Sequence, residues 1–233
     1  MKNTTRTRKA GLLENRKSST KELLIDVGER LLGQHGFDGI SLREIAAAAG
    51  QANTNAVQYH FKDKAGLVSA ILDDRVLRIE QVRCAQLAML DDDRVVPRQL
   101  LKVMWLPLMT IQDENGHHSF CRFMLQYLLY RGLAQHPLAP FYHFPLTPDT
   151  EDQGLFPCGK KTAQLLMSLH PDLPQPVIYK RISSLARMFL ASVVEHDNAR
   201  ASGITDAEYD IRHILDMAVA ALAAPAVNYP DHK

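Results

Sequence analysis

The feature that most constrains this chain is a pattern of helix starts that recurs along it. A Ser or Thr followed three residues later by Glu forms a capping box, in which the two side chains satisfy each other's free backbone N–H groups. This pairing occurs at Ser19 and Glu22, at Ser41 and Glu44, and at Thr205 and Glu208. The sequence therefore predicts helices that begin near residues 19, 41 and 206.

Apolar residues at helical spacing predict further helices. Leu24, Val27, Gly28 and Leu31 share one face of the first helix, and Gly36 supplies its C-terminal stop. Helices are expected over about residues 19–35, 41–49, 53–60, 63–90, 98–112, 118–133, 159–170, 177–200 and 206–223. Residues 134–158 contain five prolines and are expected to form a loop. Since no stretch of useful length alternates as a strand does, the predicted fold class is all-α.

The charge of the chain is unevenly distributed. Residues 1–64 hold eleven Lys and Arg against seven Asp and Glu, a net charge of +4, whereas the remainder carries −3. A basic head on a mildly acidic body favours a polyanionic partner, although a solubilising tail would also explain it. Residues 1–18 are expected to form a basic flexible arm. Basic residues of this arm could contact the DNA backbone or enter a minor groove, and a tail that makes no DNA contact is the alternative. The candidates are Arg6, Arg8, Lys9, Arg16 and Lys17.

Other bulk features favour the cytoplasm. No apolar run approaches the roughly 20 residues needed to span a bilayer, and the basic N-terminus lacks the apolar segment of a secretory signal. Cys84, Cys121 and Cys158 lie far apart in the sequence and make no metal-ligand spacing. We therefore expect three free, buried thiols in a reducing compartment, and no membrane partner.

Residues 41–61 have the spacing of a helix-turn-helix, with two short helices separated by a turn at Gly50. Two helices cross closely only where the contact residues are small, as Ala46, Ala49 and Ala56 are. Asn and Gln can pair bidentately with adenine, and an Arg such as Arg43 suits guanine. The expected outer surface of the second helix carries Asn53, Thr54, Asn55, Gln58, Tyr59 and His60. Spacing alone fits an ordinary helical hairpin with a polar surface equally well.

A family resemblance favours the DNA-binding alternative. The stretch from Phe37 to Gly50 (FDGISLREIAAAAG), followed by Tyr59-His60-Phe61-Lys62-Asp63-Lys64 and Leu67, resembles the DNA-binding domain of the tetracycline-repressor (TetR) family. The resemblance covers about residues 19–75, roughly a quarter of the chain. It implies a three-helix DNA-binding domain over 19–64 and a larger helical ligand-binding and dimerisation domain over 65–226. Residues 53–60 would be the recognition helix.

The resemblance also implies DNA contacts by position. Ser41 and Arg43 fall where family members touch DNA from the first helix of the motif, and Tyr59 and His60 fall at an aromatic and a phosphate-contacting position. Lys64 matches the basic residue that binds phosphate at the start of the fourth helix. Two departures affect the register of Asn53, Thr54 and Asn55: Gln51 replaces the usual Val, and segment 50–61 is one residue longer than the commonest form. The predicted DNA-binding residues are Ser41, Arg43, Asn53, Thr54, Asn55, Gln58, Tyr59, His60 and Lys64.

The same resemblance implies that the last two helices pair with their copies in a homodimer. Two apolar stripes with small residues are compatible with this, and a stripe of intramolecular core is the alternative. A two-fold operator needs two heads, which favours the dimer. The residues predicted for this interface are Leu185, Met188, Phe189, Ser192, Ile211, Leu215, Ala218 and Leu222.

A ligand pocket is expected among helices 98–133 and 159–190, closed by the proline-rich loop. An apolar or aromatic small molecule would suit side chains of this kind, although each residue alone also fits plain core. The candidate lining residues are Trp105, Met109, Phe120, Met124, Tyr127 and Tyr130. His117, His118 and Cys121 have spacings that could converge on a metal, but exposed histidines at a helix start are the favoured interpretation, so no metal or cofactor is predicted.

These features together predict a ligand-responsive transcription regulator. A dimer would occupy a palindromic operator as a repressor, and a small molecule would release it by shifting the fourth helix; activation is the open alternative. No nucleophile elbow, zinc-protease motif or P-loop is present, so an enzyme is not expected. The runner-up is a helical ligand-binding or scaffold protein that no longer binds DNA.

Overall fold

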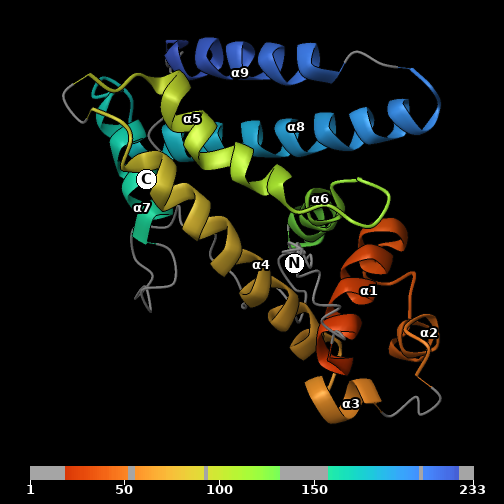
Figure 1. Ribbon diagram of the computed structural model, residues 1–233. Coiled ribbons are helices and arrows are strands. Elements are labelled where there is room, and N and C mark those ends of the chain that lie inside the picture. Colours follow the sequence, from red (N-terminus) through yellow and green to blue (C-terminus); the bar gives the residue numbers. More distant parts are fainter. Residues whose placement is uncertain (1–18, 52–55, 92–93, 132–156, 205–206, 226–233) are drawn as a thin grey trace, which may run out of the picture.

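The computed structural model describes residues 19–51, 56–91, 94–131, 157–204 and 207–225. These residues form nine α-helices and one 3₁₀ helix and contain no strand (Figure 1). The all-α prediction is therefore confirmed. The predicted arm at 1–18, the expected loop up to residue 156, the cap residue Thr205 and the candidate contacts Asn53, Thr54 and Asn55 lie outside the described residues.

The helices lie close to their predicted positions. They are α1 (Thr20–His35), α2 (Leu42–Ala48), α3 (Ala56–Phe61), α4 (Lys64–Leu87), α5 (Pro97–Trp105), the 3₁₀ helix η1 (Leu106–Thr110), α6 (Ser119–Arg131), α7 (Pro157–Ser168), α8 (Gln175–Ala201) and α9 (Ala207–Ala223). The single helix expected over 98–112 is instead divided at Trp105. Pro107 explains the division, because it has no N–H to donate to the carbonyl of Val103 and its ring crowds that carbonyl. The Arg83 side chain donates to this carbonyl instead, at 3.4 Å.

Helix ends follow the capping motifs. The Glu22 amide donates to Ser19 Oγ at 3.2 Å, while the Ser19 amide donates to the Glu22 carboxylate at 2.9 Å. The Asp63 carboxylate caps α4 by accepting from the Gly66 amide at 2.8 Å. Gly36 ends α1 with φ at 73°, in the left-handed region that favours glycine. The local sequence thus sets where each of these helices begins and ends.

The short helices α1, α2 and α3 gather at one end of the molecule, and α8 and α9 lie along each other at the other end (Figure 1). The long helix α4 connects the two ends, running from α3 to the corner where α5 and α7 lie. Helix α6 packs on both α1 and α8. Any change at the far end of α4 therefore has a continuous helical path to α3.

A single hydrophobic core extends from α1 to α9. Phe37, which follows α1, places its ring 5.5 Å from that of Phe123 and 5.0 Å from that of Tyr130, both on α6. Helices α1 and α6 approach closely at Gly33, where an added Cβ would lie 3.0 Å from the Phe123 backbone nitrogen. The three-helix end is thus packed onto the rest of the chain rather than joined to it by a linker.

The predicted dimer stripes are largely enclosed within one chain. Five of the eight residues are less than a tenth exposed: Leu185, Phe189, Leu215, Ala218 and Leu222. They are buried where α8 packs against α9 and where α5 and α6 cover this pair. Their packing within one chain favours the alternative of intramolecular core, and a place in the dimer interface stays a prediction. Met188, Ser192 and Ile211 are half-buried and keep part of their surface at the protein exterior.

The expectation of three free thiols is wrong for two of them. Cys84 on α4 and Cys158 on α7 form a disulfide across 74 residues of sequence, with their Cα atoms 5.2 Å apart. Their sequence separation gave no cue, because the fold alone brings α4 and α7 together. Cys121 is a free, buried thiol, as expected. It donates to the Leu108 carbonyl at 3.6 Å, and burial raises the pKa of its thiol.

Candidate nucleic-acid interface

The α2–α3 unit presents one buried and one exposed face. Ile45 and Ala46 of α2 and Val57 of α3 are fully buried against α1 and α4. These buried residues fix how α2 and α3 are turned, so that polar residues on the other sides of the two helices face outward. Arg43 of α2 and Gln58 of α3 are both exposed. The small Ala46 leaves room for the close crossing expected at the turn.

Helix α3 also exposes aromatic groups. Tyr59 is 86% exposed, an unusual degree for so large a ring, and His60 beside it is also exposed. The two rings meet edge to face with centroids 5.1 Å apart. We name Arg43, Gln58, Tyr59 and His60 the α2–α3 face. Its donors, acceptors and rings are suited to contacts with phosphates and base edges.

Ser41 has a structural role at the edge of this face. Its Oγ accepts from the Glu44 amide at 3.3 Å and donates to the Glu44 carboxylate at 2.6 Å. The Ser41 hydroxyl and amide hold the pKa of Glu44 below its ordinary value. Since the hydroxyl proton is already used, Ser41 would contact DNA only by exchanging this partner. Its DNA contact stays a prediction.

Lys64 is half-buried at the start of α4, where the sequence placed it. Its ammonium donates to the carbonyl of Phe37 at 2.7 Å and to that of Ile40 at 2.6 Å. Two of its three N–H groups therefore fix the turn between α1 and α2, and one remains for an anion. The phosphate contact stays a prediction, and sequence reasoning missed the structural role.

A buried ion-pair network lies behind the interface and joins α1, α4 and α6. Arg75 of α4 donates to Glu29 and to Asp26 of α1, each at 2.5 Å. Ser119 at the start of α6 donates to the other oxygen of Glu29, also at 2.5 Å. Burial raises the pKa of Glu29, although the Arg75 guanidinium opposes this. This Arg75 network fixes the position of α4 against the three-helix end.

Tyr130 makes a second link between the two ends of the molecule. Its ring stacks on Phe37, and its hydroxyl donates to the Asp38 carboxylate at 2.7 Å. Burial, and then Asp38, raise the pKa of Tyr130 to about 12. The sequence placed Tyr130 in a ligand pocket, but its described contacts hold the loop between α1 and α2.

The other predicted pocket residues are mostly core. Trp105 is 1% exposed and stacks on Phe189 with ring centroids 5.4 Å apart. Phe120, Met124 and Tyr127 are likewise buried, and Met109 is half-buried against the core. A role of these side chains in ligand binding stays a prediction. Their closely packed contacts favour the alternative of plain core.

A cavity of about 590 Å³ lies elsewhere, between α1, α4 and the segment from η1 to α6. None of the six predicted pocket residues lines it, and its wall combines charged residues with apolar ones such as Leu23, Val82 and Ile111. The charged lining residues are Asp26, Glu29, Arg30, Arg75, Arg78, Asp113 and Glu114. The sequence did not reveal this cavity, because these residues come from three separate segments and share no motif.

The suggested metal set at His117, His118 and Cys121 is not brought together. His118 Nδ1 lies 2.8 Å from Asp197, whereas His117 Nδ1 lies 3.6 Å from Asp113. Among the described residues, the His, Cys, Asp and Glu side chains close enough to share a metal are instead Glu80, Cys84 and Cys158. No helix in the part of the chain that the structure describes is long and apolar enough to cross a membrane.

Residues 24–71 match the model of a family described as bacterial regulatory proteins, tetR family. The chain is 40% identical over 58 residues to the HTH-type transcriptional regulator YttP of Bacillus subtilis (strain 168). It is 46% identical over 52 residues to the HTH-type transcriptional regulator AcrR of Shigella flexneri. These segments are 25% and 22% of this chain and 28% and 24% of the two relatives, so the chain spans about a quarter of their lengths.

The similarity of fold extends further than the similarity of sequence. The crystal structure of a TetR-family transcriptional regulator from Rhodococcus sp. aligns with 88% of this chain and 100% of its own, with a TM-score of 0.53 and 15% identity. At this identity the match shows a shared fold. The family model matches residues from α1 to α4, whereas the crystal structure matches both the three-helix end and the larger helical part.

Proposed function

We propose that this protein is a TetR-family transcription regulator that binds a palindromic DNA operator as a homodimer. The observation that carries the proposal is the α2–α3 face, which is polar, exposed and fixed by a buried opposite side. A surface of this kind can enter a major groove. DNA binding also accounts for the charge of +4 carried by residues 1–64.

On the α2–α3 face, side chains divide by chemistry into two kinds of contact. Gln58 and Arg43 can each make bidentate contacts with a base, to adenine and guanine respectively. His60 and the free N–H of Lys64 are suited to phosphates, which position the protein without reading sequence. Replacing a base-reading residue would change which sequence is preferred, whereas replacing a phosphate-binding residue would weaken all sequences alike.

The proposed dimer uses the outer surfaces of α8 and α9, since the inner stripes are already buried. Met217 is 42% exposed on α9, and Met188 and Ser192 of α8 are partly exposed. Two heads on one duplex must be spaced by about 34–36 Å, one turn of DNA, or by a multiple of it. The interface between α8–α9 pairs would fix this spacing.

Release by a small molecule is proposed to act through α4. The Arg75 network and Lys64 together fix the position of α4 against α1. A ligand that moves α4 would therefore change the orientation of the DNA-binding head, which consists of α1, α2 and α3. The cavity of about 590 Å³ is lined by residues of both α1 and α4, so a ligand bound there would contact both helices. A ligand shifts the equilibrium only by its differential affinity for the two states, so it must favour the non-binding one. Repression by blocking a promoter is the mode that we propose.

Genomic binding-site selection with the purified protein tests the proposal. We expect a small set of fragments to be retained at low ionic strength, with a common two-fold symmetric sequence and a steep loss of affinity as salt rises. The control is Gln58→Ala, which keeps the buried side of α3 intact and should change the selected sequence. Retention of no fragment by a folded protein would favour the scaffold alternative instead.

A further inference from the structure

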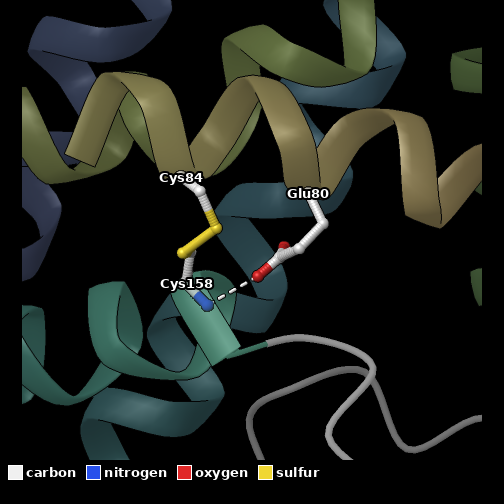
Figure 2. A group of neighbouring side chains, drawn as sticks. All are labelled: Glu80, Cys84 and Cys158. Atoms are coloured by element: carbon white, nitrogen blue, oxygen red, sulfur yellow. Dashed lines mark hydrogen bonds between the residues drawn. A yellow bond between two sulfur atoms is a disulfide. The ribbon is translucent and has the colours of Figure 1, made fainter. Parts of the chain in front are cut away.

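The disulfide joins two helices at the end of the molecule away from the α2–α3 face. Cys84 lies in the last turn of α4, and Cys158 is the second residue of α7 (Figure 2). Both residues are half-buried. Cys121, in contrast, is fully buried and its thiol has a raised pKa. The described residues therefore hold one partly exposed cysteine pair and one fully buried thiol.

Glu80 holds the two cysteines near each other independently of the sulfur–sulfur bond. One oxygen of its carboxylate accepts from the Cys158 amide at 2.6 Å and from the Gly159 amide at 2.9 Å, which caps the N-terminus of α7 (Figure 2). The other oxygen accepts from Arg83 at 2.7 Å. A reduced pair would thus remain within bonding reach, which favours rapid reoxidation.

The same contacts argue against a metal at this position. The ligand atoms of Glu80, Cys84 and Cys158 lie within 4.8 Å of one another. Both oxygens of Glu80, however, are already bound by two amides and a guanidinium. A metal would have to displace these partners, and two thiolates alone fall short of the four ligands of a structural zinc site. Disulfide chemistry needs no such displacement.

We propose that Cys84 and Cys158 form a reversible redox pair, oxidised by hydroperoxides, whose state regulates operator binding. This inference rests on the proposed function, because it assigns a regulatory input to the same DNA-binding head. A protein that binds chromosomal DNA works in a compartment where thiols are kept reduced, and disulfides found there are usually redox-sensing or catalytic. A partly exposed pair that links α7 to α4, the helix that leads to the DNA-binding head, fits the sensing role.

The chemistry balances with one equivalent of peroxide. One thiolate attacks a peroxide oxygen, the O–O bond breaks, and a sulfenic acid and hydroxide form. The second thiolate then attacks the sulfenic sulfur and expels the second hydroxide as the S–S bond forms. With hydrogen peroxide, the two sulfur atoms lose two electrons, and the two hydroxides take up the two protons released by the thiols to give two water molecules; an organic hydroperoxide gives one water and one alcohol. A dithiol reductant reverses the change by thiol–disulfide exchange and is itself oxidised to a disulfide.

Helix α4 provides the path from the pair to the DNA-binding head. Lys64 and Cys84 are 20 residue steps apart, which is about 30 Å of continuous helix. At the near end, Lys64 binds the carbonyls of the turn between α1 and α2. At the far end, Arg83 donates to the Met104 carbonyl at 3.0 Å, so the same corner also contacts the end of α5. Reduction leaves the hydrogen bonds of Glu80 in place but removes the covalent link, so α4 and α7 can shift against each other, and such a shift alters the orientation of the DNA-binding head.

The first experiment measures thiol chemistry in the folded full-length chain, using alkylation with iodoacetamide and intact mass. After dithiothreitol we expect rapid labelling at Cys84 and Cys158 and slow labelling at Cys121; hydrogen peroxide should abolish the rapid labelling and a second dithiothreitol treatment should restore it. The control Cys121→Ala should behave identically. A bond that dithiothreitol cannot reduce in the folded protein would overturn the proposal. Stoichiometric zinc binding by the reduced protein, absent in C84S/C158S, would overturn it in favour of a metal site.

The second experiment compares operator affinity of the oxidised and reduced protein on a selected fragment. We expect the dissociation constants to differ by at least about fivefold, the lower end of typical allosteric coupling. The difference should vanish in C84S/C158S, with its fold checked by circular dichroism, and persist in Cys121→Ala. Equal affinities in both states would refute redox control while leaving DNA binding intact. Failure of either form to bind any DNA would refute the proposed function itself.

Discussion

Replacing Arg75 with Met tests how the molecule joins its DNA-binding end to its body. Arg75 is 4% exposed and binds Glu29, which is 1% exposed. Met fills a similar volume but cannot donate a hydrogen bond. Among the described residues, the Glu29 carboxylate would then keep only the hydrogen bond from Ser119. Removing one member of a buried ion pair costs about 3–5 kcal/mol, because the other charge stays buried without compensation. For a domain whose whole stability is about 5–15 kcal/mol, this is a large fraction.

The loss in Arg75→Met has a pH signature that distinguishes it from a simple packing defect. Burial already raises the pKa of Glu29, and Arg75 counteracts the rise, so the variant should raise this pKa further. Between the ordinary Glu pKa and the raised one, the folded state holds a proton that the unfolded state releases. The free energy of unfolding therefore falls as pH rises through this window. The destabilisation relative to the parent protein should be larger at about pH 8 than at about pH 5.

Urea unfolding, monitored by the fluorescence of Trp105, the one tryptophan of the chain, measures the free energy of unfolding of parent and variant at both pH values. The matched control is Arg78→Met on the same helix. Arg78 is 60% exposed and binds Asp74 at 3.1 Å, so its loss should change the free energy of unfolding by at most about 1 kcal/mol. Equal losses for the two variants, or a loss at Arg75 that does not depend on pH, would refute the reasoning.

Three further substitutions probe other parts of the molecule. Gly33→Ala should lose about 1–2 kcal/mol of stability in urea unfolding, because the new Cβ meets the rigid Phe123 backbone; a gain in stability would contradict that close approach. Ser41→Ala should lower the thermal midpoint through a cap worth about 1 kcal/mol, and an unchanged midpoint would show that the cap is dispensable. Arg43→Ala should relax the preference at one operator position and cost about 1–3 kcal/mol of affinity for the selected site, and an unchanged preference would exclude a base contact by Arg43.

Much of the fold could be predicted because its determinants are local. Ser19 and Ser41 with their partner glutamates mark helix starts in the sequence, and the structure shows both capping boxes. Leu24 and Leu31 share the buried face expected from their spacing. The exposed positions of Arg43 and Gln58 follow from the same periodicity. In each case the information lies within one or two turns of helix.

Features that depend on pairing between distant segments could not be predicted in this way. Cys84 and Cys158 meet because α4 packs on α7, and nothing near either cysteine indicates that contact. The stripe containing Phe189 and Leu215 shows an apolar face but not whether a neighbour in the same chain or a second chain covers it. One overlooked signal was present: Arg75 lies four residues after Ile71 on a buried face, a position that requires a buried acidic partner.

The central claim is that the α2–α3 face contacts DNA, and site-specific photocrosslinking tests it most directly. The photoreactive amino acid p-benzoylphenylalanine would replace Tyr59, which is 86% exposed, or the control Met89, which is 85% exposed beyond the far end of α4. We predict that irradiation on a selected genomic fragment crosslinks the protein to DNA from position 59 and not from position 89. Crosslinking from position 89 alone, or from neither position with the fragment bound, would contradict the account.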